Sequence, residues 1–278
     1  MADDARRALL RALIDYAGLF PPAQLEMEDA VAGYREARSG PYAWMLDRFV
    51  CPSARLDELS AHGADPSWPV TVTSDVSEVE TALAYSGSLS ITAVELRLPP
   101  DTGADVVASL GNSARTVFVE LPLGESTEEL LEAVADAGLA AKVRCGGTAP
   151  APEPTALAAF IAGCAERDLA WKATAGLHHP FRDIDPESGL PRHGFVNVLA
   201  AAGLAAQGAG QADIEEVLAD DDAAGAFALD AAALHWRGRE IGAEARRRFD
   251  GYGSCSFDEP VEDLLALGAL EPAEVPHG

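Results

Sequence analysis

The stretch Ala141-Lys142-Val143-Arg144-Cys145-Gly146-Gly147 alternates apolar and charged side chains and then turns at two glycines. A period of two is typical of a β-strand with one face in an apolar core, because successive strand side chains point to opposite faces. A second stretch, Trp171-Lys172-Ala173-Thr174-Ala175-Gly176, repeats this pattern further along the chain. The pair predicts two strands of one sheet whose charged faces lie on the same side.

These two strands carry both lysines of the chain, and the other 18 of its 20 basic residues are arginine. Lysine is a compact amine that can lose its proton when buried and attack a carbonyl carbon, whereas arginine keeps its proton. The two lysine positions therefore favour a chemical role for this side chain. The alternative is that an arginine-rich composition left two lysines without any role.

Strand-like and helix-like runs alternate through most of the chain. The strand-like runs lie at 44–51, 69–74, 91–98, 116–122, 139–145 and 169–175, with later ones at 226–237 and 252–257. Helix-like runs at 53–61, 76–85, 103–110, 127–137 and 154–167 separate the first six strands. Alternation of this kind predicts βαβ units and a parallel sheet. Eight strands in 278 residues favour an α/β fold of the (β/α)8 TIM type, which needs ~250 residues.

The first 40 residues read as an N-terminal helical segment, with helices expected over 4–17 and 26–38. The Pro-rich stretch 148–154 has the length of an ordinary loop, so we expect residues 1–278 to form a single barrel domain. A doubly wound open sheet is the alternative fold, but the G-x-G-x-x-G phosphate fingerprint after its first strand is missing.

Composition restricts the class of protein. A formal net charge of -25 argues against a nucleic-acid partner, because phosphate binding requires a basic face. No apolar run is long enough to cross a bilayer, and the amino terminus lacks the basic start and apolar core of a signal peptide. The four cysteines contain no CxxC pair, which indicates reduced thiols. We therefore expect a cytoplasmic protein without a membrane partner.

Strand parity collects a set of charged and polar side chains on the inner face of the predicted barrel. That set is Glu95, Arg97, Glu120, Lys142, Arg144, Lys172 and Thr174. Burial of so many charges is costly unless they pair with one another or bind something. A structural lattice of ion pairs is one interpretation. Charged residues near the carboxyl ends of barrel strands are more often an active site, which is the interpretation we adopt.

Lys172 is the predicted nucleophile. Its neighbours Lys142 and Arg144 are cations and its site is desolvated, so we expect its pKa to be lowered enough for Schiff-base formation. Lys142 would tune the amine, and Glu120 and His178 would move protons. The predicted substrate-binding residues are Arg144, Thr174, Glu95, Arg97, His179, His193, Asn197 and Asp15. The expected substrate is a small anionic carbonyl compound, because Arg144 can hold a carboxylate or phosphate with two hydrogen bonds.

The Lys172-Ala173-Thr174-Ala175-Gly176 motif resembles the K-x-[ST]-x-G Schiff-base strand of the deoxyribose-phosphate aldolase group of class I aldolases. The 142–147 stretch is similar to the second lysine strand of that group, which ends in two glycines. The match covers about a dozen residues, and the two motifs occur here in the reverse order. The resemblance implies an aldolase-like lyase in which Lys172 forms the Schiff base and Lys142 lowers its pKa.

Two other functions remain open from the sequence. His178, His193 and Glu120 are the candidate ligands of a divalent metal, zinc or manganese, in a lyase, isomerase or hydrolase. The aldolase interpretation requires no cofactor. A non-catalytic barrel that binds an anionic metabolite is the third interpretation. In each case the expected partner is a small anionic metabolite, and assembly into a homo-oligomer is compatible with all three.

Overall fold

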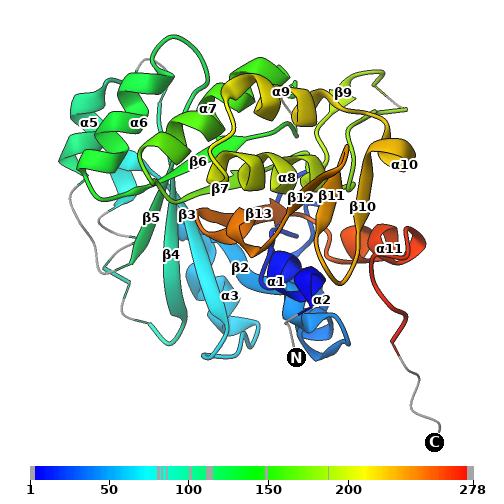
Figure 1. Cartoon of the computed structure of the whole chain (residues 1–278). Coiled ribbons are helices and arrows are strands. Elements are labelled where there is room, and N and C mark those ends of the chain that lie inside the picture. Colours follow the sequence, from blue (N-terminus) through cyan, green and yellow to red (C-terminus); the bar gives the residue numbers. More distant parts are fainter. Residues whose placement is uncertain are drawn as a thin grey trace, which may run out of the picture.

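The computed structural model describes residues 4–79, 82, 84–85, 87–99, 102–110, 115–147, 150–186 and 188–273. Its centre is a closed barrel of eight strands (Figure 1). In barrel order they are β1 (Ile14–Tyr16), β2 (Leu46–Pro52), β3 (Pro69–Asp75), β4 (Ser90–Arg97), β5 (Thr116–Glu120), β6 (Ala140–Arg144), β7 (Trp171–Thr174) and β13 (Phe249–Ser254). Every neighbouring pair is parallel. The predicted (β/α)8 fold is therefore confirmed.

Helices lie outside the ring of strands (Figure 1). The α-helices are α1 (Ala5–Leu10), α2 (Met27–Ser39), α3 (Leu56–Ala61), α5 (Ala104–Ser109), α6 (Thr127–Asp136), α7 (Pro154–Glu166), α8 (Phe195–Ala206), α9 (Gln211–Ala219), α10 (Ala223–Ala226) and α11 (Asp258–Ala266). Short 3-10 helices occur at η1 (Ala43–Met45), η2 (Ser53–Arg55), η3 (Val76–Glu78) and η4 (Ala243–Arg246). Among the described residues, no helix has the length and apolar character needed to cross a membrane.

The outward strand side chains form the main core together with the helices. Residues such as Val94, Val119 and Val143 are fully buried there, as are Leu131 and Val134 of α6. Inside the barrel a small second cluster forms from Ala93, Phe118 and Ala140. This division of apolar residues leaves the interior above the second cluster to polar and charged side chains, as the alternation in the sequence predicts.

The first barrel strand lies where the sequence indicated a helix. The expected helix over 4–17 stops at Leu10, Ala12 has a positive φ of 46°, and Ile14–Tyr16 then form β1. All three residues of β1 are buried, so a periodicity of hydrophobic residues could not distinguish so short a strand from the end of a helix. Residues 1–40 are thus not simply a helical extension, because they supply the first strand of the barrel and helix α2.

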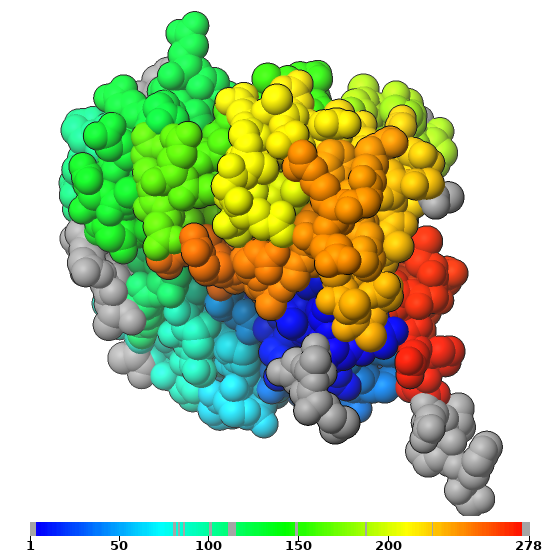
Figure 2. All heavy atoms as spheres, in the orientation of Figure 1, coloured from blue at the N-terminus to red at the C-terminus, as the bar shows by residue number. Residues whose placement is uncertain are grey.

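The predicted strand at 226–237 is not part of the barrel. It forms a three-stranded antiparallel sheet of β10 (Phe227–Leu229), β11 (Leu234–Trp236) and β12 (Arg239–Ile241). This sheet belongs to the long connection between β7 and β13, which also contains α8, α9 and the hairpin β8 (Asp183–Ile184) and β9 (Pro191–Arg192). In Figure 2 the yellow and orange atoms of α9 and β10–β12 form a continuous layer over one face. The strand count of eight was correct, but β1 takes the place of this segment.

Candidate active site

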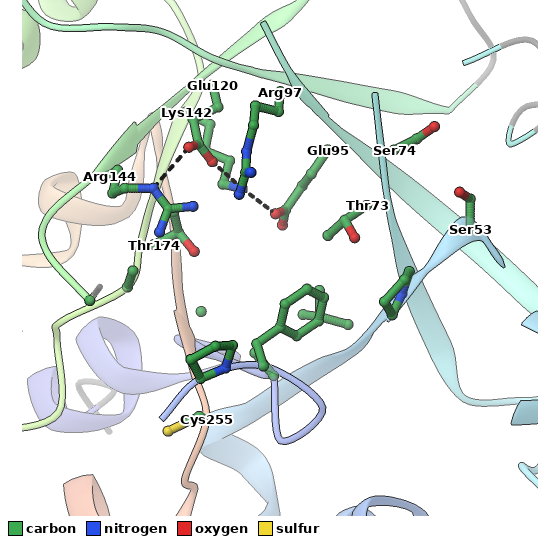
Figure 3. Close-up of a pocket in the computed structure, with 18 of the residues that line it drawn as sticks. Ser53, Thr73, Ser74, Glu95, Arg97, Glu120, Lys142, Arg144, Thr174 and Cys255 are labelled. Carbon is green, nitrogen blue, oxygen red and sulfur yellow. Dashed lines mark hydrogen bonds and ion pairs between the residues drawn. The ribbon is translucent and has the colours of Figure 1, made fainter. Parts of the chain in front are cut away.

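A cavity of about 440 Å³ opens at the carboxyl ends of the barrel strands. Its polar lining includes Ser53, Thr73, Ser74, Glu95, Arg97, Glu120, Lys142, Arg144, Thr174, His178 and Cys255. Figure 3 shows that the charged side chains from β4, β5 and β6 gather on one side of this space, with Cys255 across from them. Catalytic groups of TIM-type barrels occupy this end of the fold, so the cavity is the candidate active site.

Lys142 lies at the centre of the charged side of the cavity. Its Nζ is 2.7 Å from Oε2 of Glu95 and 2.8 Å from Oε2 of Glu120. Glu120 also accepts a hydrogen bond of 3.0 Å from Nε of Arg144 (Figure 3). The Lys142 side chain keeps 7% of its surface exposed, and it contributes to the wall of the cavity. The Lys142 amine therefore pairs with two carboxylates and lies in the wall of the cavity, where a small ligand can reach it.

Lys172 lies on the same inner face, but deeper in the barrel. The register of β6 and β7 makes it the direct neighbour of Lys142, as strand parity predicts. Its Nζ donates to Oε1 of Glu95 at 2.6 Å and to Oδ2 of Asp15. Only 1% of the side chain is exposed, and it is absent from the described residues that line the cavity. Lys172 is therefore enclosed by carboxylates beneath the floor of the site.

The pKa of Lys172 is shifted in the direction opposite to the one expected from sequence. Burial alone lowers the pKa of this amine, but attraction by the carboxylates of Asp15 and Glu95 is stronger and raises it above its ordinary value. Burial likewise opposes ionisation of Glu95, yet Lys142 and Lys172 together lower the pKa of Glu95 to about 2. The expectation of a lowered Lys172 pKa is wrong because sequence parity did not place Asp15 beside the amine.

The structure places a further cation, Arg48, next to the carboxylates that surround Lys172, and the sequence analysis did not identify it. Arg48 of β2 donates from Nη1 to Oδ2 of Asp250 at 2.6 Å, and its backbone N–H donates to Oδ1 of Asp15 at 3.0 Å. Asp15 was expected to reach the substrate, but it lies inside the barrel between Arg48 and Lys172. The signal for Arg48 was present in the sequence, since Arg48 interrupts the strand-like run 44–51 as Lys142 interrupts its own strand.

Two of the predicted histidines pair with helix α11. Nδ1 of His178 is 3.1 Å from Oε2 of Glu259 and 3.9 Å from Sγ of Cys255, and His178 lines the cavity. Nδ1 of His179 is 2.8 Å from Oδ2 of Asp263, and His179 does not belong to the described lining. His178 thus remains available for proton transfer, whereas the placement of His179 does not support substrate binding.

His193 and Asn197 are structural in this fold, which corrects their assignment as substrate-binding residues. Nε2 of His193 is 2.7 Å from the carbonyl oxygen of Pro152, and burial lowers the pKa of its ring to about 4. Asn197 donates to the carbonyl oxygens of Val217 and Asp220, both at 2.8 Å. These contacts fasten the start of α8 to neighbouring segments, away from the described wall of the cavity.

The candidate metal ligands do not form a set. Glu120 and His178 line the cavity, but His193 is engaged with the main chain elsewhere. Within the described part of the chain, no group of three His, Cys, Asp or Glu side chains is arranged to hold a metal ion. The donor arrangement therefore does not support the predicted ligand set for zinc or manganese.

A comparison with solved structures agrees with the barrel fold of the chain. No model of a known protein family matches the chain, and no curated protein matches it. Among solved structures, deoxyribose phosphate aldolase from Aeropyrum pernix, described as having a unique tetrameric structure, superposes with a TM-score of 0.55. The match covers 95% of this chain and 98% of that chain at 14% identity. The shared feature is the fold. It confirms the resemblance drawn from the lysine motifs at the level of barrel architecture.

Proposed function

We propose that this protein is a lyase of the Schiff-base aldolase type that acts on a small anionic carbonyl compound. The observation that carries the proposal is the amine of Lys142, which lies in the cavity wall in contact with two carboxylates. An amine in such a place can be freed for attack when a neighbouring carboxylate takes its proton. The solved aldolase with the same barrel supports this class of reaction.

Within this proposal the two lysines exchange the roles expected from sequence. Lys172 is 1% exposed and its raised pKa keeps it protonated, so it is poorly suited to attack a carbonyl carbon. Lys142 borders the cavity and is the amine that a substrate meets. We therefore assign Schiff-base formation to Lys142, and we assign to Lys172 the role of a fixed cation that compensates Glu95 and Asp15.

The proposed reaction balances without a cofactor. The Lys142 amine adds to the carbonyl carbon, and loss of water leaves a protonated imine. A base then removes the proton from the substrate hydroxyl on the carbon β to the imine carbon. That oxygen forms a carbonyl as the bond between the α and β carbons breaks, the first carbonyl product leaves, and the electron pair of the broken bond moves into the imine to give an enamine. Protonation of the enamine and addition of water release the second product and free the amine. Glu120, in contact with Lys142, and His178 are the groups placed to move these protons.

We assign the anionic end of the substrate to the part of the cavity wall that Arg97, Arg144 and Thr174 form. Arg97 lines this wall, and no ion pair of its guanidinium is present among the described residues. Arg144 donates from Nε to Glu120, and within the described part of the chain its other two guanidinium nitrogens have no hydrogen bond or ion pair that would compete with a ligand. Together with the hydroxyl of Thr174, these groups can orient a carboxylate or phosphate.

The proposal also covers the assembly of the chain and its cellular compartment. The solved relative is described as tetrameric, so we propose that this chain also assembles into a homo-oligomer, which light scattering of the purified protein tests. The four cysteines are free, in agreement with a reducing compartment such as the cytoplasm.

Borohydride trapping tests the proposed function. The protein is incubated with a panel of small aldehydes and ketones, each bearing a carboxylate or phosphate, and is then reduced with borohydride. Mass spectrometry measures the mass of the reduced protein. The expected result is one covalent adduct for some member of the panel, and none when Lys142 is replaced by arginine. Binding of panel members without any adduct would favour the alternative of a non-catalytic barrel for anionic metabolites.

A further inference from the structure

A cluster of charges lies at the amino ends of two barrel strands, at the opposite end from the cavity. Arg48 and Asp47 are near the start of β2, and Asp250 is near the start of β13. Nη1 of Arg48 is 2.6 Å from Oδ2 of Asp250 and 3.3 Å from Oδ2 of Asp47. None of the three belongs to the described wall of the cavity, so none is placed to contact substrate.

This cluster is connected to the lysine pair through Asp15. One oxygen of Asp15 accepts the backbone N–H of Arg48 at 3.0 Å, and the other is 3.5 Å from Nη1 of Arg48 and accepts from Lys172. Lys172 in turn contacts Glu95, and Glu95 contacts Lys142. Charges of alternating sign therefore follow one another from the amino end of the barrel to the cavity.

We infer that Arg48 is a positioning residue that holds Asp15 against Lys172 from the amino end of the barrel and so sets the charge that the Lys142 amine experiences. The inference rests on the proposed function only in naming Lys142 as the reactive amine. Arg48 has 15% of its side chain exposed, and charges enclosed in this way interact over longer distances than charges in water.

Arg48 differs from the other charged groups around Lys142 in its position and in its partners. Those groups are Glu95 and Arg97 of β4, Glu120 of β5, Arg144 of β6, Lys172 of β7, Asp15 of β1 and Asp75 of β3. Arg246 also lies near the amino end, but its guanidinium donates to the carbonyl oxygens of Leu9, Arg11, Ala12, Phe249 and Asp250. Arg48 is thus the cation that joins the carboxylates of Asp15, Asp47 and Asp250.

Competitive acetylation measures the effect without any substrate. The protein is labelled with trace acetic anhydride between pH 7 and 10 beside a free amine as internal standard, and the rate at Lys142 is read from its peptide. Removal of a cation makes a nearby ammonium hold its proton more firmly. Arg48→Gln should therefore lower the rate at pH 9 by about threefold to tenfold. Asp47→Asn removes an anion and should raise the rate by about twofold.

The opposite signs distinguish an electrostatic effect from a loosened fold, which would move both variants in the same direction. Arg48→Lys keeps the charge and should restore a rate close to that of the unchanged protein. Arg167→Gln removes a cation paired with Glu128 on the outer helices and serves as the matched control. If Arg48→Gln does not fold, the increase in Asp47→Asn carries the test.

Equal shifts in Arg48→Gln and Arg167→Gln, or no increase in Asp47→Asn, would overturn the inference. Either result would leave the proposed function intact, since borohydride trapping at Lys142 does not depend on Arg48. Conversely, opposite shifts without any trapped adduct would support the positioning role and count against the aldolase proposal.

Discussion

Lys142 and Lys172 are neighbours in the register of β6 and β7, and the two oxygens of one carboxylate, Glu95, separate their charges. Oε2 of Glu95 is 2.7 Å from Lys142, and Oε1 is 2.6 Å from Lys172. Glu120 and Asp15 each add a further carboxylate to one lysine. Each amine thus contacts two carboxylates, and Lys142 is the one of the two that lines the cavity.

Replacement of Lys172 by methionine should destabilise the protein strongly. The change leaves the buried carboxylates of Asp15 and Glu95 without their shared cation, and removal of one partner of a buried ion pair costs about 3–5 kcal/mol. Urea denaturation at pH 7 measures the loss. The matched control is Arg55→Met, which removes a cation paired with Glu58 on the surface and should cost no more than about 1 kcal/mol. Equal losses in the two variants would contradict the buried network.

Stability should fall as the pH is lowered from about 4.5 to about 2. The pKa of Glu95 is lowered from 4.5 to about 2 in the folded protein, so its charged form is favoured by folding. The stabilisation is therefore complete above pH 4.5 and disappears as the pH falls through 2. Its size is of the order of 3 kcal/mol. Denaturation across this pH range, compared with Glu95→Gln, isolates the effect, and parallel curves for the two proteins would refute it.

Gly176→Ala should damage the mouth of the cavity. Gly176 has a φ of 75°, and an added Cβ would lie 2.9 Å from Cα of Gly146 and 3.1 Å from the backbone nitrogen of Gly147. The backbone atoms of Gly146 and Gly147 cannot move aside as a flexible side chain can. We therefore expect the free energy of unfolding to fall by about 2–3 kcal/mol or more. Gly189 has a similar φ of 70° with nothing within 4 Å of its Cβ position, and Gly189→Ala isolates the cost of φ alone. Similar melting temperatures for the two variants would show that the close approach is unimportant.

His178→Gln should lower turnover without a large loss of stability. The ring lines the cavity beside Glu259, and a general acid or base of this kind contributes about 10²–10⁴ in rate. The experiment compares kcat for a substrate identified by trapping. His179→Gln, which changes the neighbouring ring paired with Asp263, is the control and should retain most activity. Comparable rates in both variants would remove His178 from the reaction.

Strand parity made much of the site predictable. The inner face of β4, β5, β6 and β7 follows from the period of two, because a charged residue in every second position of a buried strand can face only one way. Glu95, Glu120, Lys142 and Arg144 consequently line the cavity as the sequence indicated.

The remaining parts depend on contacts that periodicity does not encode. Asp15 lies on a strand of three buried residues, and the depth of each lysine along the barrel axis depends on the register between strands. Asp250 is near a register shift between β13 and β7, where alternation is interrupted. The charge environment of Lys172 therefore depends on the order β1–β13–β7 in the barrel, which periodicity does not encode.

The most direct test of the central claim is to locate the adduct after reduction with borohydride. The chain has two lysines, so a reduced Schiff base is assigned by the peptide that carries the added mass. The experiment compares the unchanged protein with Lys142→Arg and Lys172→Arg, each checked for folding by circular dichroism. We expect the adduct on Lys142, its loss in Lys142→Arg and its retention, at a reduced rate, in Lys172→Arg. An adduct on Lys172 that persists in Lys142→Arg would contradict the assignment of the reactive amine.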